Sequence, residues 1–388
     1  MRAEAAIGVG PNWHEALTAA VSQTTLPKGE EGVDLALLFA SQDYVANFPE
    51  LLSETQRTTG AKVLIGCSGQ GVIGPAREIE HGAALALQLF SLPGVKLQTT
   101  TVTQTRLSDS DALRRDLEAI GEVNAWLLFA DPFTLDSESL LQLFSTLFPG
   151  VPLVGGLASG HPRRQQTHVF LNGQVLDQGA VALAISGAYT VQTVVSQGCA
   201  PIGETWTITG ATGNIVETIA FRPALDVLMD TFNALPESMQ ERARRNLLVG
   251  LAMDEYKDEF GRGDFLIRNI MGIDRDSGII AIGAMPRVGQ TIQFQVRDPD
   301  AADEDLHILL GKAKTALGDQ PAVGALLCCC NGRGVGLFGT PDHDIRVVEE
   351  LMGPMPVAGF FCNGEIGPVG GKNFLHGFTA SMALIVPV

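Results

Sequence analysis

The chain has 388 residues, of which 45% are hydrophobic and 18% charged, as expected for a soluble globular protein with a large core. Its net charge of −17 and sequence pI near 4.8 exclude nucleic acid and anionic membranes as expected partners, because phosphate groups require a basic stripe. No apolar run is long enough for a membrane-spanning helix, so the mean hydropathy of +0.18 indicates buried sheet. The N-terminal residues do not resemble a signal peptide, and we expect a cytoplasmic protein.

The predicted elements begin with a helix over residues 12–23, with Asn12 as its N-cap. One pattern then occurs three times: an apolar run, a helix-like stretch, an apolar run with a glycine cluster, and a Gly-led apolar strand. The first runs cover residues 33–39, 125–129 and 325–330, and the glycine-containing runs cover residues 63–71, 151–160 and 357–364. The spacing between them is nearly constant, at 27, 26 and 29 positions from Phe39 to Gly66, Phe129 to Gly155 and Cys330 to Gly359.

Two apolar runs that flank a helix predict a βαβ crossover with a parallel strand pair. We therefore expect an α/β protein of two parts, built from three related β-α-β-loop-β units with mixed sheets. The unit helices are expected at residues 43–59 and 136–147, the second capped by Asp136 or Ser137. The three glycine-rich loops are equivalent in this scheme, and a ligand is expected where they gather.

Between the second and third units the pattern changes to a β-rich α+β segment. Residues 205–219 predict a hairpin, Pro223 begins a helix that runs to about residue 234, and a charged helix covers residues 237–246. Strands are expected at residues 247–253, 264–273, 279–285 and 290–297, followed by a helix at residues 301–317. We place the boundary between the two parts near residue 222.

The motifs for familiar catalytic sites are incomplete. Residues 69–74 and 334–339 both match G-x-G-x-x-G, but Pro75 follows the first, and the helix after the second is expected only from residues 340–342. Residues 66–70 resemble a nucleophile elbow without its last glycine. We therefore expect no catalytic residues, no cofactor and no enzyme.

Six cysteines contain no CxxC pair, so no metal site is expected. Cys328, Cys329 and Cys330 lie on one predicted strand, where packing is the plainer interpretation. A thiol switch that uses these three cysteines and Cys362 is the alternative, because Arg333 is close enough in sequence to lower a thiol pKa.

Arg333 and Glu365 each follow a strand of the third unit, and parallel strands would place them at one sheet edge. Two interpretations stay open. The residues form a structural ion pair that joins two loops, or they hold an amphoteric ligand, with its carboxylate on Arg333 and its amine on Glu365.

Several stretches of the chain resemble the FIST proteins, the F-box and intracellular signal transduction family. They are Gly66-Cys67-Ser68, Gly155-Gly156, GCAPIG at residues 198–203, Arg333-Gly334 and GFFCNGEIGP at residues 359–368. Of these stretches, GCAPIG and GFFCNGEIGP are the ones specific to the family. The resemblance covers a FIST N-like part at residues 31–222 and a FIST C-like part at residues 223–370.

This resemblance implies a sensory, non-catalytic protein of signal transduction that binds a small ligand, with amino acids or their derivatives as the expected class. FIST-like sequence fills nearly the whole chain, so we expect the signal to pass to a separate partner protein. A protein-interaction scaffold is a further alternative. The expected ligand-binding residues, from the glycine loops and the charged pair, are Cys67, Ser68, Gly69, Gly155, Gly156, Ser159, Gly198, Cys199, Pro201, Arg333, Cys362, Asn363 and Glu365.

Overall fold

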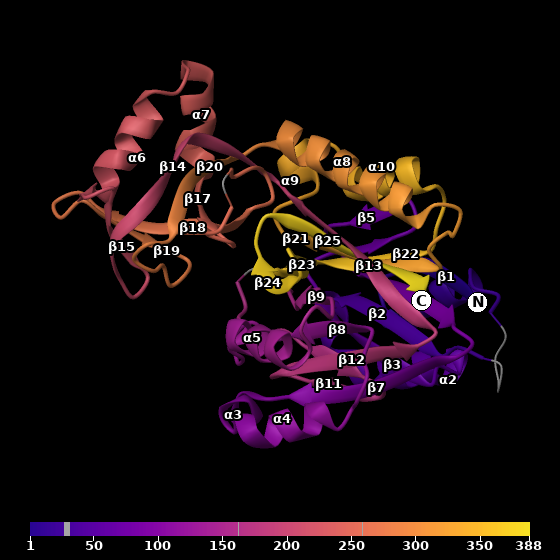
Figure 1. Ribbon diagram of the computed structural model, residues 1–388. Helices are drawn as coiled ribbons and strands as arrows, with labels where there is room; N and C mark the ends of the chain where they lie inside the picture. The colour runs from indigo at the N-terminus through magenta and orange to yellow at the C-terminus, as the bar shows by residue number, and fades with distance from the viewer. Residues whose placement is uncertain (27–31, 162, 258) are drawn as a thin grey trace. The chain divides into compact units, whose positions relative to one another are not determined.

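The computed structural model describes residues 1–26, 32–161, 163–257 and 259–388. The chain folds into two compact units (Figure 1). Unit 1 comprises residues 1–195, 306–375 and 379–388, and unit 2 comprises residues 196–305 and 376–378. Unit 2 is thus an insertion in the chain of unit 1. These spatial units differ from the predicted sequence division near residue 222, which stays a prediction about the two sequence parts.

Within the described residues, unit 1 contains three mixed sheets of six strands each. In spatial order, the first consists of β1 (Arg2–Val9), β6 (Ala84–Ser91), β2 (Leu35–Ser41), β3 (Val63–Gly69), β10 (Val169–Leu171) and β11 (Gln174–Leu176). The second consists of β24 (Lys372–His376), β23 (Glu365–Val369), β9 (Leu153–Leu157), β8 (Ala125–Ala130), β12 (Ala180–Gly187) and β7 (Val95–Val102). The third consists of β13 (Tyr189–Gln197), β25 (Thr379–Pro387), β21 (Gly324–Cys330), β22 (Val357–Cys362), β4 (Val72–Gly74) and β5 (Arg77–Ile79). The predicted α/β class with mixed sheets is confirmed.

Each sheet contains one of the predicted parallel pairs, namely β2–β3, β8–β9 and β21–β22. In every pair a glycine lies opposite a leucine: Gly66 opposite Leu38, Gly155 opposite Leu128, and Gly359 opposite Leu327. A Cβ atom on these glycines would lie 1.8, 1.9 and 1.7 Å from the leucine carbonyl oxygens. The glycines therefore allow close approach of two backbones.

A short hairpin follows each parallel pair and joins a different sheet. The hairpin β4–β5 follows β3 and pairs with β22, whereas β10–β11 follows β9 and pairs with β3. The hairpin strand β23 follows β22 and pairs with β9. The hairpins are thus exchanged in a cycle among the three sheets, a feature that the sequence analysis did not predict.

The three sheets share one hydrophobic core, and helices cover their outer faces. At the centre, the rings of Phe39, Phe129 and Phe360, one from each sheet, lie in mutual contact with centroid separations of 4.9–5.9 Å. The outer layers are formed by α1 (Trp13–Ser22) and α2 (Phe48–Thr59), by α3 (Gln104–Ser108), α4 (Ser110–Glu118) and α5 (Ser137–Leu147), and by α8 (Pro299–Leu317) and α10 (His343–Met352). Figure 1 shows α8 and α10 lying along the sheet that contains β21 and β22.

The residues predicted as N-caps mark the starts of two helices correctly. Asn12 accepts a hydrogen bond from the Glu15 amide, and Asp136 accepts one from the Ser139 amide, as expected of N-caps. The predicted helix over 43–59 is instead a 3₁₀ helix, η1 (Gln42–Asn47), followed by α2. The expectation that helix begins only after Gly339 was wrong, because the short helix α9 (Val335–Phe338) lies inside the glycine motif.

Unit 2 is an antiparallel sheet with two helices, as predicted for the inserted segment. Its elements are β14 (Cys199–Thr212), β15 (Ile215–Ile219), β16 (Arg222–Pro223), α6 (Ala224–Asn233), α7 (Glu237–Asn246), β17 (Leu247–Ala252), β18 (Phe265–Asp274), β19 (Ile279–Ile282) and β20 (Thr291–Arg297). Strand β14 pairs with β20 in its first part and with β15 in its last part, which closes the sheet on itself.

Candidate functional site

The glycine loops of the first two predicted units meet through two fully buried serines. The Ser68 hydroxyl donates to the Ser159 carbonyl (2.8 Å) and accepts from the His168 amide (3.1 Å). The Ser159 hydroxyl accepts from the Gln70 amide (2.7 Å) and donates to the Phe361 carbonyl. The two serines therefore fix the loops, because their hydroxyl groups are already engaged in hydrogen bonds with the backbone.

A cavity of about 330 Å³ lies where these loops end, at the carboxyl ends of β2, β3 and β9. We call it the loop cavity. Its lining residues are Gln42, Asp43, Gly69, Gln70, His81, Gly82, Gly160, His161 and Arg164. The carboxyl ends of strands are where open α/β sheets bind ligands. The lining combines a carboxylate, a guanidinium group, two imidazoles and two amides around glycine backbone.

Of the predicted site residues, Gly69 lines the loop cavity. Cys67 and Cys362 belong to the central core, and Gly155 and Gly156 lie in β9, where Gly156 pairs with Glu365. Asn363 is exposed and donates through its side chain to the Ala158 carbonyl (3.0 Å). Three others, Gly198, Cys199 and Pro201, belong to unit 2. Ligand contact by these other residues stays a prediction.

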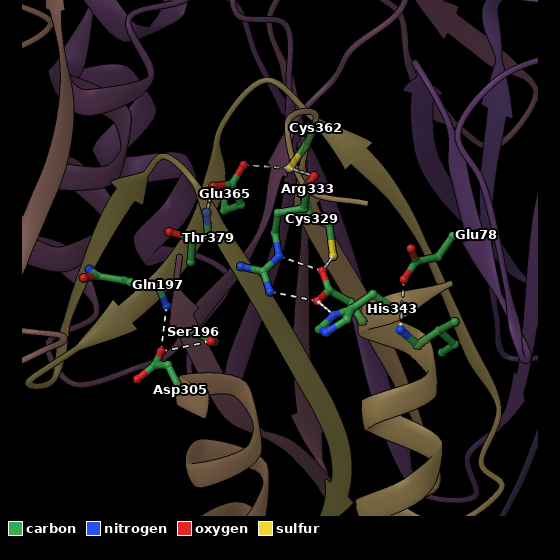
Figure 2. Close-up of polar contacts among 12 residues, drawn as sticks. Glu78, Ser196, Gln197, Asp305, Cys329, Arg333, His343, Cys362, Glu365 and Thr379 are labelled. Atoms are coloured by element: carbon green, nitrogen blue, oxygen red, sulfur yellow. Dashed lines mark hydrogen bonds and ion pairs between the residues drawn. The ribbon is translucent and has the colours of Figure 1, made fainter. Parts of the chain in front are cut away.

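The structure pairs Arg333 with Asp344, not with Glu365 (Figure 2). Arg333 Nε and Nη2 donate to the two carboxylate oxygens of Asp344 at 2.6 and 2.7 Å, and both side chains are buried. The predicted ion pair between Arg333 and Glu365 was therefore wrong. The planar guanidinium group can donate two parallel hydrogen bonds to one carboxylate. Asp344, at the start of α10, is the carboxylate that accepts them.

Asp344 and Arg333 form a buried group of polar residues with three neighbours, which we call the Arg333 cluster. Its members are Glu78, Cys329, Arg333, His343 and Asp344. His343 Nδ1 lies 3.1 Å from Asp344, and the Cys329 thiol donates to Asp344 at 3.4 Å. The exchanged hairpin contributes Glu78, whose Oε1 accepts from the Ile345 amide at 2.9 Å. The cluster thus joins the first and third predicted units.

The pKa values in the cluster follow from burial and from the charge of Arg333, which acts on both Asp344 and Glu78. The Arg333 guanidinium lowers the pKa of Asp344, outweighing the opposing effect of burial, and Asp344 raises the pKa of Arg333. Burial raises the pKa of Glu78 from its ordinary value of 4.5 to about 8, and the charge of Asp344 adds to that shift. Glu78 therefore keeps its proton at neutral pH while Asp344 stays ionised.

Glu365 is fully buried on a different strand. Its Oε2 accepts from the Thr379 amide at 3.0 Å, and the Cys362 thiol lies 3.2 Å from Oε1 (Figure 2). A carboxylate held in this way fixes the start of β25 to the start of β23. The amine of a free ligand would have to displace these contacts.

Four of the six cysteines, three of them members of the proposed thiol switch, lie in an environment that suppresses thiolate formation, whereas Cys330 is partly exposed. Burial raises the pKa of Cys67, Cys328, Cys329 and Cys362, all of which are fully buried. Burial and then the charge of Asp344 raise the pKa of Cys329, and the opposing charge of Arg333 does not overcome them. This environment disfavours the thiol switch.

The described residues contain neither a metal-binding cluster nor a membrane-spanning helix. Among the described residues, no three His, Cys, Asp or Glu side chains are arranged to hold a metal ion. In the same part of the chain, no helix combines the length and apolar character needed to cross a membrane.

The comparisons with known proteins identify the family. The FIST N domain matches residues 34–221, and the FIST C domain matches residues 224–368. The chain belongs to the FIST family. The uncharacterized protein Rv0628c of Mycobacterium tuberculosis is 42% identical over 356 residues, 91% of each chain. The uncharacterized protein Mb0898c of Mycobacterium bovis is 38% identical over 392 residues, 98% of each chain.

FIST domains are sensory domains of signal transduction, and the two matched domains together account for nearly all of this FIST protein. The sequence analysis missed most of the loop cavity. Gln42 and Asp43 directly follow the first apolar strand, the same positional signal that singled out Arg333. Arg164 and His161 follow the second glycine cluster within a few residues. Asp344 gave no such signal, because it lies on a helix eleven residues after Arg333.

Proposed function

We propose that this FIST protein is a cytoplasmic, non-catalytic sensor that binds an amino acid or a related zwitterionic metabolite in the loop cavity. The observation that carries the proposal is the presence of Asp43 and Arg164 in one cavity. A guanidinium group recognises a carboxylate, and a carboxylate recognises an ammonium group. A separate signalling protein would receive the signal.

The cavity size also supports this class of ligand. About 330 Å³ lies at the lower end of the range for small-molecule sites, which suits a free amino acid better than a nucleotide cofactor. Gly69, Gly82 and Gly160 bring backbone N–H and C=O groups to the wall without side chains in front of them. In this proposal Arg164 and Asp43 bind the ligand carboxylate and amine, the roles that the sequence analysis gave to Arg333 and Glu365.

The first test is a thermal-shift screen with the twenty proteinogenic amino acids. A ligand present at about 100 times its Kd stabilises the folded state by about 2.7 kcal/mol, so a binder should raise Tm by several degrees. Arg164→Gln should abolish the shift, because the ligand carboxylate loses its cation.

Arg163→Gln is the matched control, since Arg163 is an exposed neighbour outside the cavity lining. It should leave the shift unchanged. A screen in which no amino acid raises Tm would contradict the proposal, as would a shift that survives Arg164→Gln and Asp43→Asn.

A further inference from the structure

The hairpin β4–β5 connects the loop cavity to the Arg333 cluster. Gly69 and Gln70 precede the hairpin, and His81 and Gly82 follow it, so both of its ends form part of the cavity wall. Its second strand carries Glu78 into the cluster (Figure 2). A movement of the cavity wall therefore acts on the same short segment that holds Glu78.

Four hydrogen bonds tie this hairpin segment to the helices of the third unit. The Ala76 amide donates to the Glu349 carboxylate (2.8 Å), and the Glu78 amide donates to Asp342 (2.7 Å). In the other direction, Glu78 Oε1 accepts from the Ile345 amide at 2.9 Å, and Glu80 Oε1 accepts from the Val335 amide at 2.8 Å. The hairpin cannot shift without changing contacts at the starts of α9 and α10.

Neither protonation state of Glu78 is fully stabilised by its surroundings. It is only 6% exposed, and its Oε2 has no hydrogen-bond partner in the described part of the chain. The neutral acid would bury an O–H group without an acceptor, whereas the ionised acid would add a second carboxylate beside Asp344. The only cation in the cluster that is charged at all pH values, Arg333, already binds Asp344.

Charged and titratable groups from several elements interact with Glu78. They are Asp342 before α10, Asp344 on α10, Arg333 before α9 and Cys329 on β21, and His343 on α10 contacts Asp344 in turn. Their balance makes the free energy of protonation sensitive to small displacements, because Coulomb energies in a buried site change steeply with distance.

We propose that Glu78 is a proton-binding site coupled through the β4–β5 hairpin to ligand binding in the loop cavity. The protein then responds to its ligand and to pH together. The coupling rests on the proposed function. By linkage, ligand binding shifts the proton affinity of Glu78 by the same factor by which protonation shifts the ligand affinity. The proton itself exchanges with bulk water.

The first experiment needs no ligand. The Glu78 carboxyl carbon is followed by carbon-13 NMR, and the amides of Gly69, Gln70 and Gly71 by nitrogen-15 NMR, from pH 5 to 9 in the wild-type chain. We expect the carboxyl signal to titrate with a midpoint near 8 and the three amides to shift with the same midpoint. In Glu78→Gln, the component of the amide shifts with that midpoint should disappear.

Arg77→Gln is the matched control, because it removes a charge from the exposed face of the same strand and Arg77 takes part in none of the four hydrogen bonds. It should keep the coupled titration. Amide chemical shifts that do not change with the Glu78 midpoint would overturn the coupling. A Glu78 carboxyl group that titrates near 4.5 would overturn it as well. The wild-type titration decides this even if a variant fails to fold.

The second experiment measures the Kd at pH 6, 7, 8 and 9 of whichever of the twenty amino acids raises Tm. The ratio of wild-type to Glu78→Gln affinity should change at least threefold across this range. A constant ratio overturns the coupling while leaving the proposed function in place. Absence of any binder, with the amide titration as expected, overturns the proposed ligand class alone.

Discussion

At the scale of single residues, Asp344 makes the burial of Arg333 possible. Arg333 is 1% exposed, its Nη1 has no hydrogen-bond partner within the described residues, and its other two nitrogens bind one carboxylate. The ring of Phe338 lies 5.2 Å from the guanidinium carbon and adds a cation–π contact. The pair links the loop after β21 to α10, and ligand contact by Arg333 stays a prediction.

We predict that Asp344→Asn lowers the free energy of unfolding by about 3–5 kcal/mol, because it leaves a buried guanidinium group without its counter-charge. Chemical denaturation measures the change. The control is Asp116→Asn in the exposed pair with Arg106, where the loss should be at most about 1 kcal/mol. Equal losses in the two variants would show that Arg333 reaches solvent or another acid.

Glu78 gives a second prediction, on stability against pH. Its folded pKa of about 8 lies above the ordinary 4.5, so the folded state binds the proton more tightly than the unfolded state. The stability of the wild type relative to Glu78→Gln should therefore be greatest below 4.5. It should fall as pH rises toward 8, by about 1.4 kcal/mol per pH unit at the steepest. Urea denaturation at several pH values measures this, and a flat difference would contradict a raised pKa.

At the scale of elements, the parallel pairs depend on glycine at one position. Gly66, Gly155 and Gly359 each lie where a Cβ would be within 2 Å of a backbone oxygen of the neighbouring strand. Backbone in the middle of a six-stranded sheet cannot retreat without breaking ladder hydrogen bonds. The hairpins that leave these strands are exchanged among the sheets, so a distortion in one pair reaches the neighbouring sheet.

We predict that Gly155→Ala destabilises the protein by at least about 3 kcal/mol or prevents soluble expression, because the added methyl group overpacks the sheet. The control is Gly173→Ala in the turn between β10 and β11, where an added Cβ meets no atom within 4 Å. Thermal unfolding of both variants compares them. A Gly155→Ala variant that unfolds at the wild-type Tm would mean that β8 and β9 separate more easily than the packing indicates.

At the scale of the whole molecule, unit 2 enters and leaves unit 1 at neighbouring residues. The Ser196 hydroxyl and the Gln197 amide donate to the Asp305 carboxylate at 2.9 and 2.8 Å. Insertions whose ends lie close together can be removed with little strain on the host fold. The loop cavity is formed entirely by residues of unit 1.

We predict that replacing residues 196–305 by a short Gly-Ser linker leaves unit 1 cooperatively folded, as measured by circular dichroism during thermal unfolding. The amino-acid-dependent rise in Tm should persist in this variant. Loss of the rise with the fold intact would instead support the sequence-based expectation that residues 198–203 contribute to the site.

Local patterns predicted much of the fold. The alternation of apolar runs and helices gave the three parallel pairs, and single polar residues such as Asn12 and Asp136 gave helix starts, because a cap bonds within its own turn. The candidate site was harder to predict. Gly69 was found because it belongs to the first glycine cluster, but Arg164 lies beyond the second cluster and Asp43 lies in a 3₁₀ helix.

The α/β class, the parallel pairs and the family can be predicted from the amino-acid sequence, because each depends on residues that are close together along the chain. The exchange of the hairpins, the pairing of Arg333 with Asp344 and the position of the loop cavity become known only from the folded chain. Those features depend on which distant segments meet. Periodicity reports that a side chain is buried, but it carries no information on the partner, which is set by sheet order and by competition among buried charges.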